Sequence, residues 1–225
     1  MKIWLDTIDL DIVAEAAKMG ILSGITTNPS ILSKTKDVPK TLNTLLELQK
    51  GPLAVQVTAQ NPEEMILEGM HISKFSDRII VKVPVTRNGL KAIKELRARN
   101  VPVLGTGVYH PTQALLAMNL GTAYIAPYFS HIDKISNAKA VLEEIMKILQ
   151  TNRFETKLMV ASLKTLDDII FSSLIGAHAI TIKDELFTKL VADQASWELM
   201  SHQFQSDWQQ AHGSASIKDL LKSPI

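Results

Sequence analysis

Cysteine is absent from the 225 residues, and the sequence holds no long apolar run. Without cysteine no disulfide can form, which suits a reducing compartment. No segment approaches the roughly 20 apolar residues that cross a bilayer. The apolar start of the chain is too short for a signal peptide and is interrupted by Asp6. We therefore expect a soluble cytoplasmic protein with no membrane partner.

An excess of charge is also lacking, because 24 basic and 23 acidic residues leave a net charge of +1. No basic block or acidic tail is present, so we expect no nucleic-acid partner. The six histidines lack metal-ligand spacing, and the absence of cysteine further disfavours zinc. We therefore expect no metal site.

Short β-like runs alternate with helical patterns, giving eight strand–helix units of roughly 20 to 35 residues each. This alternation predicts right-handed crossovers and a parallel sheet. Eight units in a chain of this length favour a (β/α)8, or TIM, barrel. A doubly wound open sheet is the competing architecture, but the sequence has no G-x-G-x-x-G motif and no P-loop. We expect an α/β single-domain barrel over residues 1–191.

Two helix starts carry clear local signals. Asp9 is placed to cap a helix that ends at Gly20. Asn61 offers a second cap, and Pro62 after it is favoured at the first helical position.

Residues 192–225 follow the eighth unit and predict an extra C-terminal helix with an apolar stripe. The stripe consists of Trp197, Met200, Phe204 and Trp208, which recur at helical spacing. It packs either on its own barrel or on a neighbouring subunit, and the sequence leaves both open. The residues from Gly213 onward are small and polar, and we expect them to be frayed.

The run at 79–86, IIVKVPVT, places Lys82 inside an otherwise apolar strand. Burying an ammonium is costly unless it is paired or loses its proton. Alternation puts Ile80, Lys82 and Pro84 on one face of the strand. If that face points into the barrel, burial lowers the lysine pKa and gives a neutral amine that can form a Schiff base with a carbonyl. If the side chain bends out to water instead, Lys82 is an ordinary surface lysine.

Nearly every predicted strand ends in a hydrogen-bonding or ionisable residue, and catalytic residues of a parallel barrel gather at those ends. These residues are Asp6, Thr26 with Asn28, Gln56, Lys82, Thr106, Tyr128 and Ser162. A Schiff-base lysine needs a group that takes a hydroxyl proton when a carbon–carbon bond breaks. Asp6, Tyr128 or a bound water could do this, and Thr26 and Asn28 could orient the substrate hydroxyls.

Six motifs spread over essentially the whole chain resemble the small transaldolase family, and within it the fructose-6-phosphate aldolase branch. They are LDT at 5–7, GITTNPS at 24–30, VKVPVT at 81–86, LGTGVY at 104–109, APYFSHID at 126–133 and VASLK at 160–164. The resemblance implies a class I aldolase on a (β/α)8 barrel, with Lys82 as the Schiff-base residue. It further implies cleavage of D-fructose 6-phosphate to dihydroxyacetone and D-glyceraldehyde 3-phosphate, and the reverse addition, without a cofactor.

The resemblance also implies a role for each strand-end residue. Those expected at the dihydroxyacetone portion are Asp6, Thr26 and Asn28. Those expected to hold the water or proton of the acid–base steps are Gln56, Thr106 and Tyr128, while Ser162 would bind the phosphate. Assembly into a homo-oligomer, a pentamer or decamer, is implied as well.

Three positions bear on the branch and the substrate. True transaldolases of this family carry glutamate where this chain has Gln56, and usually phenylalanine where it has Tyr128, so both residues favour the aldolase branch. The family arginine that binds phosphate is His131 here. Histidine is only partly charged near neutrality, so we expect weaker or pH-dependent phosphate binding, with Lys164 able to compensate. The preferred acceptor could even be unphosphorylated.

Three other functions stay open. A transaldolase would transfer dihydroxyacetone between sugar phosphates instead of releasing it. A non-catalytic sugar-phosphate-binding barrel would need no buried lysine. A structural protein would account for the C-terminal stripe but not for the polar strand ends.

Overall fold

The computed structural model describes residues 1–221 of the chain. It divides into two compact units, Met1–Phe187 and Thr188–Ile225. The division falls within a helix of residues 184–190, a little before the boundary expected after residue 191. The two units are described separately below.

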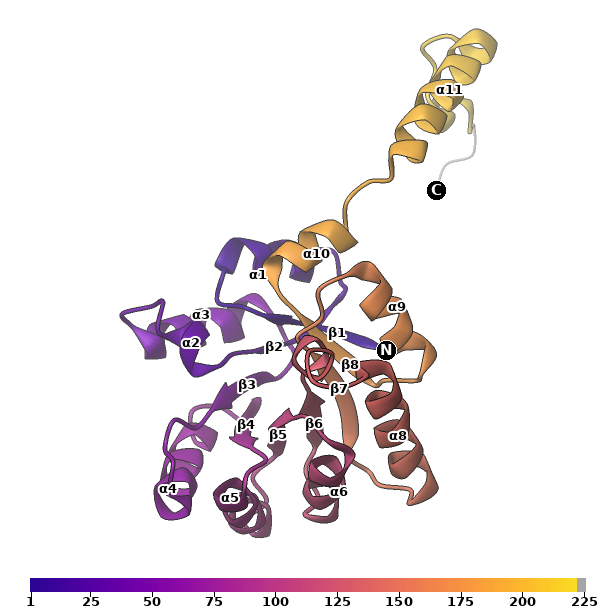
Figure 1. Cartoon of the computed structure of the whole chain (residues 1–225). Coiled ribbons are helices and arrows are strands. Elements are labelled where there is room, and N and C mark those ends of the chain that lie inside the picture. The colour runs from indigo at the N-terminus through magenta and orange to yellow at the C-terminus, as the bar shows by residue number, and fades with distance from the viewer. Residues whose placement is uncertain (222–225) are drawn as a thin grey trace. The chain divides into compact units, whose positions relative to one another are not determined.

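The first unit is a closed barrel of eight parallel strands, each paired with the next in sequence and the eighth with the first (Figure 1). This confirms the (β/α)8 barrel and excludes the open sheet. The strands are β1 Lys2–Asp6, β2 Leu22–Thr26, β3 Leu53–Gln56, β4 Ile79–Pro84, β5 Val103–Val108, β6 Tyr124–Pro127, β7 Lys157–Ala161 and β8 Ala179–Ile182.

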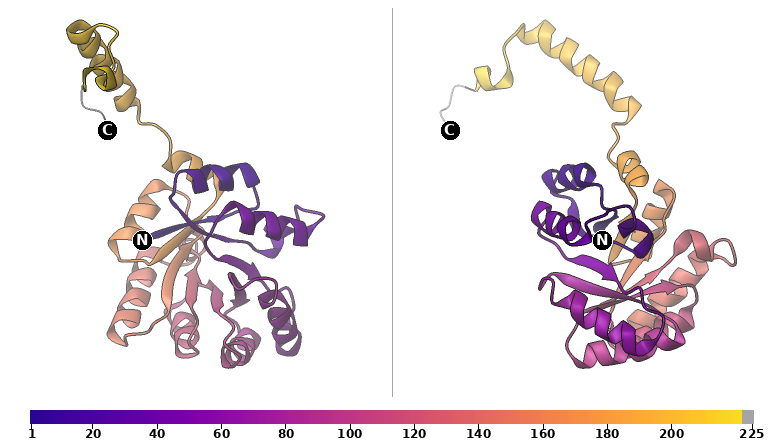
Figure 2. Two further views of the ribbon diagram at one scale, coloured as in Figure 1. Left: turned by 180° about the vertical axis from the view of Figure 1, so that it is seen from behind. Right: turned by 90° about the vertical axis from the view of Figure 1, so that its left-hand side faces the viewer.

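Helices follow every strand and form the outer layer around the barrel, as the two further views in Figure 2 show. Their apolar faces, such as that of α8 with Leu142 and Ile145 fully buried, cover the outside of the strands. The helices up to residue 190 are α1 Leu10–Lys18, α2 Pro29–Leu32, α3 Val38–Leu48, α4 Pro62–Ser73, α5 Arg87–Ala98, α6 Pro111–Asn119, α7 Phe129–Ile132, α8 Ala138–Thr151, α9 Leu166–Leu174 and α10 Asp184–Leu190.

The two helix starts expected from the sequence are confirmed. The Asp9 carboxylate accepts hydrogen bonds from the first backbone N–H groups of α1, and the chain turns after α1 at Gly20, whose φ is +73°. The Asn61 side chain caps α4, with Pro62 at its first position. The short helices α2 and α7 are additions to the expected elements, and each follows a strand end that carries polar residues.

The barrel interior below the strand ends is filled by one apolar cluster. Alternate residues of the strands point inward, and Trp4 of β1 packs edge-on against Tyr124 of β6 with ring centroids 5.6 Å apart. Gly24 of β2 lies against the Trp4 ring, where a Cβ atom would come within 2.7 Å of an indole carbon. The cluster also contains Ala54, Ile80, Leu104, Ala126, Met159, Ala161 and Ala179. It fills the lower part of the barrel, and a cavity opens above it at the carboxyl ends of the strands.

The second unit contains the expected C-terminal helix, α11 Ala195–His212, and a short helix, α12 Ile217–Leu220. Trp197 and Phe204 contact each other with ring centroids 6.1 Å apart, and both are about half exposed, at 53% and 52%. No helix within residues 1–221 combines the length and hydrophobicity needed to span a bilayer.

The expected fraying after Gly213 is wrong for residues 216–220. Ser216 caps α12, and the Trp208 indole N–H donates to the Ala215 carbonyl oxygen at 2.6 Å. These two contacts supply local hydrogen bonds that the composition did not indicate. The last four residues, 222–225, lie outside the described part of the chain.

Candidate active site

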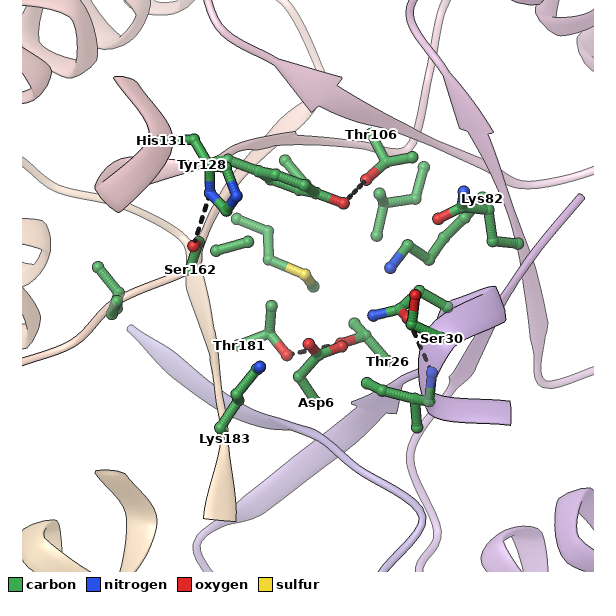
Figure 3. Close-up of a pocket in the computed structure, with 18 of the residues that line it drawn as sticks. Asp6, Thr26, Ser30, Lys82, Thr106, Tyr128, His131, Ser162, Thr181 and Lys183 are labelled. Atoms are coloured by element: carbon green, nitrogen blue, oxygen red, sulfur yellow. Dashed lines mark hydrogen bonds between the residues drawn. The ribbon is translucent and has the colours of Figure 1, made fainter. Parts of the chain in front are cut away.

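A cavity of about 610 Å³ opens at the carboxyl ends of the barrel strands. All ten side chains that the sequence predicted for a site line it, and Figure 3 shows several of them converging on one space. They are Asp6, Thr26, Asn28, Gln56, Lys82, Thr106, Tyr128, His131, Ser162 and Lys164. None of the predicted residues lies elsewhere.

Lys82 points into the barrel and not out to water, with only 4% of the residue exposed. Its Nζ atom donates a hydrogen bond to the carbonyl oxygen of Thr27, 2.7 Å away. Burial lowers the pKa of Lys82, and the nearby Asp6 carboxylate partly opposes that effect. Of the two conformations that the sequence left open, the structure adopts the one in which the amine loses its proton more easily.

Asp6 is held by a chain of two hydroxyl groups. The Thr26 hydroxyl donates to Asp6 Oδ1 at 2.7 Å, and its Oγ1 atom also lies 2.7 Å from Thr181 Oγ1. A hydroxyl has a single proton to donate. Because Thr26 uses its proton on Asp6, Thr181 must be the donor to Thr26, and the chain runs from Thr181 through Thr26 to the carboxylate.

Tyr128 and Thr106 form a second hydroxyl pair on the other side of the cavity, with their oxygens 2.9 Å apart (Figure 3). Burial raises the pKa of Tyr128, while the hydrogen bond with Thr106 acts in the opposite direction. The Tyr128 ring packs near the rings of Tyr109 and His131, with centroids 5.8 and 5.6 Å away. The phenol is therefore fixed in place and stays protonated, so it can donate a proton.

Ser162 follows β7 and stands at the centre of a third polar group. Its Oγ atom lies 2.7 Å from Ser130 Oγ and 3.0 Å from His131 Nδ1. The backbone of Ser162 adopts a φ of +62°, which is unusual for a residue other than glycine. That conformation turns its side chain towards α7, where the hydroxyls and the imidazole together offer donors to an anion.

Asn28 and Gln56 contribute amide groups at the edge of the cavity. The Asn28 Oδ1 atom caps α2 by accepting from the Ile31 backbone N–H at 3.0 Å. Its NH₂ group is left to act as a donor. Gln56 pairs in register with Lys82 on the neighbouring strand, so the amide lies beside the lysine.

Several residues that line the cavity were missed by sequence reasoning as site residues, among them Ser30, Lys34, Thr181 and Lys183. The alternation of β8 could have identified two of them. Ala179, Thr181 and Lys183 fall on the same face of that strand, and Ala179 lies in the barrel interior.

The donor set suits covalent carbonyl chemistry. A buried amine in β4, a carboxylate at the end of β1 and a protonated phenol directly after β6 face one cavity. This is the combination that a Schiff-base lysine and its acid–base partners require. Within residues 1–221, no three His, Asp or Glu side chains gather as metal ligands would.

Solved structures share the barrel. A flavocytochrome b2 mutant with benzoylformate aligns with a TM-score of 0.59 and 13% identity, over 81% of this chain and 56% of that chain. A mandelate oxidase mutant with an FMN adduct aligns with a TM-score of 0.59 and 14% identity, over 88% of this chain and 68% of the other. At such low identity the likeness concerns the fold alone.

Sequence relatives are more similar. A probable transaldolase of Aquifex aeolicus (strain VF5) is 34% identical over 211 residues, covering 93% of this chain and 97% of that protein. A probable transaldolase of Petrotoga mobilis (strain DSM 10674 / SJ95) is 32% identical over 225 residues, covering 99% of each. Residues 3–222 also match the family described as Transaldolase/Fructose-6-phosphate aldolase. This chain belongs to the transaldolase/fructose-6-phosphate aldolase family.

Proposed function

We propose that the protein is a class I aldolase that cleaves D-fructose 6-phosphate to dihydroxyacetone and D-glyceraldehyde 3-phosphate and catalyses the reverse addition. The observation that carries the proposal is the buried amine of Lys82, whose pKa is lowered by burial, inside a cavity with Asp6 and Tyr128. A cavity of about 610 Å³ is of the size that binds small molecules.

The reaction starts at the ketone. The neutral Lys82 amine attacks carbon 2 of the sugar, and uptake of one proton from solvent with loss of water gives a protonated imine that withdraws electrons from the neighbouring bond. The proton of the hydroxyl on carbon 4 passes to Asp6, directly or through a water held by Gln56 and Thr106. The bond between carbons 3 and 4 breaks, carbon 4 becomes the aldehyde of glyceraldehyde 3-phosphate, and the bonding electrons form an enamine on Lys82.

Protonation of the enamine completes the cycle. Tyr128 is held protonated and hydrogen-bonded to Thr106, so it can supply a proton to carbon 3. Water then hydrolyses the protonated imine, which releases dihydroxyacetone and the proton taken up when the imine formed. The proton that Asp6 accepted returns through water to Tyr128. Thr26 keeps Asp6 in place for these steps, and Asn28 donates to a dihydroxyacetone hydroxyl through its NH₂ group.

Transaldolase activity is the second candidate, because the relatives in Aquifex and Petrotoga bear that name. In a transaldolase the enamine waits for a second aldehyde. Gln56 in place of a carboxylate and Tyr128 as a proton donor favour protonation, and therefore release. Measuring cleavage of fructose 6-phosphate with and without an added acceptor aldehyde separates the two activities, since a transaldolase needs the acceptor.

The phosphate of the substrate is proposed to bind at Ser162, His131 and Lys164, which lie at the ends of β6 and β7. We further propose a homo-oligomer, a pentamer or decamer, in which the stripe of α11 reaches a neighbouring subunit. The half-exposed Trp197 and Phe204 rings support that assembly. Light scattering of the purified protein checks it.

Borohydride reduction with dihydroxyacetone, followed by peptide mapping, tests the proposal. An imine is reduced to a stable secondary amine, so the adduct is expected on the peptide that contains Lys82. Mapping also distinguishes Lys82 from Lys164 and Lys183, which line the same cavity. Absence of an adduct, or an adduct on another lysine, refutes the mechanism, and a simple binding barrel would give none.

A further inference from the structure

Lys183 is a cation of the cavity that the steps above do not use. It follows β8 directly and continues the inward alternation of that strand, two residues after Thr181. It lines the cavity together with Lys82. In Figure 3 its side chain reaches from the end of β8 towards Thr181 and the open space of the cavity.

The Lys183 ammonium has no partner among the described residues. Arg99 and Glu95 form an ion pair on the surface, with a guanidinium nitrogen 2.8 Å from a carboxylate oxygen. Within residues 1–221, no carboxylate forms such an ion pair with Lys183. Two of the acids that share a cavity lining with Lys183 make other interactions. Asp6 accepts from Thr26, and burial raises the pKa of Asp184, which also interacts with Thr7. The three N–H donors of Lys183 are therefore free for a ligand.

The topology places Lys183 opposite the Schiff-base lysine. In an eight-stranded closed barrel, β8 lies four strands from β4 in either direction. A sugar whose carbonyl carbon reaches Lys82 and whose chain crosses the mouth of the barrel ends on the far side, around β8. His131, Lys164 and Lys183 follow the consecutive strands β6, β7 and β8, so basic residues run from the flank of the cavity to its far side.

We propose that Lys183 binds the anionic end of the acceptor aldehyde, so that the enzyme prefers a phosphorylated aldehyde over its neutral counterpart. This inference rests on the proposed aldolase function and assigns the specificity of the same cavity. A lysine ammonium binds phosphate as a point charge from any direction. Lys164 after β7 supplies one ammonium at the site proposed for the phosphate, and Lys183 after β8 supplies a second one from the neighbouring strand.

The test compares two acceptors in the addition reaction with dihydroxyacetone: D-glyceraldehyde 3-phosphate and D-glyceraldehyde. Lys183→Met is expected to raise the KM for the phosphorylated aldehyde roughly 10- to 100-fold, the range for loss of one charge-assisted hydrogen bond. The KM for D-glyceraldehyde, which has no phosphate, should change less than about twofold. Lys183→Arg keeps the charge and is expected to retain most of the preference. Lys147→Met, an equal loss of charge on the exposed face of α8, is the control and should change neither KM.

Each outcome decides between the proposals. If Lys183→Met changes both KM values equally, or neither, Lys183 does not bind the anionic group. Reductive trapping of dihydroxyacetone on Lys82 needs no acceptor, so it reports on the aldolase function separately. Trapping in both wild type and Lys183→Met, with an unchanged preference, overturns only the role of Lys183. No trapping in the wild type overturns the aldolase function and this inference with it.

Discussion

The Nζ atom of Lys82 donates a hydrogen bond to the Thr27 carbonyl oxygen at 2.7 Å. A neutral amine has two N–H groups and one lone pair, so this contact directs one N–H to the backbone and leaves the lone pair for a carbonyl carbon. A protonated imine keeps one N–H, which can make the same bond. The Thr27 carbonyl therefore holds the nitrogen both before and after the covalent step.

Lys82→Met is expected to abolish turnover and reductive trapping, and also to change the pH dependence of stability. Burial lowers the pKa of Lys82 in the folded protein below its unfolded value of 10.5. Burial of the Lys82 ammonium therefore lowers the unfolding free energy of the wild type. This loss of stability is fully present below the folded pKa and disappears as the pH rises to 10.5. The stability of Lys82→Met relative to wild type should fall by about 1.4 kcal/mol per pH unit between those two pKa values.

Urea denaturation at several pH values from 7 to about 10.5 measures this difference in unfolding free energy. Lys91→Met, on the exposed face of α5, is a matched control in which no such trend is expected. If the difference in unfolding free energy between Lys82→Met and wild type does not change with pH, the pKa of Lys82 is the same in the folded and unfolded states.

Tyr128→Phe is expected to shift the ratio of transfer to cleavage towards transfer. The variant removes the phenol that burial keeps protonated, so the enamine is protonated more slowly and survives to meet a second aldehyde. The ratio is measured with fructose 6-phosphate and an acceptor aldehyde such as erythrose 4-phosphate. Thr106→Val, which keeps the phenol but removes its partner at 2.9 Å, should produce a smaller shift. An unchanged ratio in Tyr128→Phe refutes the role of the phenol.

Thr181→Val is expected to lower kcat through the orientation of Asp6. The variant removes the donor to Thr26, whose hydroxyl can then turn away from the carboxylate. Loss of one such hydrogen bond costs about 1 kcal/mol, which corresponds to roughly fivefold in rate. Thr181→Ser keeps the hydroxyl and should restore kcat. If the serine and valine variants are equally slow, the packing of the residue matters and the hydroxyl does not.

His131→Gln is expected to raise the KM for fructose 6-phosphate, because it removes the imidazole from the proposed phosphate site. His131 Nδ1 lies 3.0 Å from Ser162 Oγ in that site. The KM values of the variant and of the wild type are compared for fructose 6-phosphate and for unphosphorylated fructose. Equal changes for the two substrates contradict a role of the imidazole in phosphate binding.

The sequence predicted the ends of the strands better than it predicted the contacts between them. Lys82 and Tyr128 could be placed because alternation along a strand and the rule of parallel barrels act locally. The bond between Thr26 and Thr181 joins residues 155 apart in sequence, and nothing local marks it. Thr181 was therefore not predicted as a site residue, although its hydroxyl donates to Thr26, which in turn donates to Asp6.

The short helices escaped prediction for a different reason. Four residues, as in α2 and α7, are too few to show a helical period. Asn28 was placed at the site but not as a helix cap, although Asn28-Pro29 repeats the Asn61-Pro62 pattern that predicted the cap of α4. The capping role matters chemically, because it uses one lone pair of Oδ1 on the helix and leaves both N–H donors of the NH₂ group for substrate.

Gly24→Ala is expected to destabilise the barrel and to slow the reaction together. A Cβ atom at this position would lie 2.7 Å from the six-membered ring of the fully buried Trp4, and overpacking of this kind costs about 1–3 kcal/mol. In the register of β1 and β2, Trp4 pairs with Gly24 and Asp6 pairs with Thr26 two residues further on. A strand pushed outward at Gly24 therefore also weakens the bond that holds Asp6.

A double-mutant cycle with Trp4→Phe separates this contact from other effects. Phenylalanine lacks the outer indole ring, so Gly24→Ala should cost at least about 1 kcal/mol less in the Trp4→Phe background. Unfolding free energy from urea titration and kcat are both measured for the four proteins. If the effects of the two substitutions on unfolding free energy are additive, the contact between β2 and the Trp4 ring is not the reason that position 24 requires glycine. If kcat recovers along with stability, the packing of the lower barrel sets the position of the carboxylate above it.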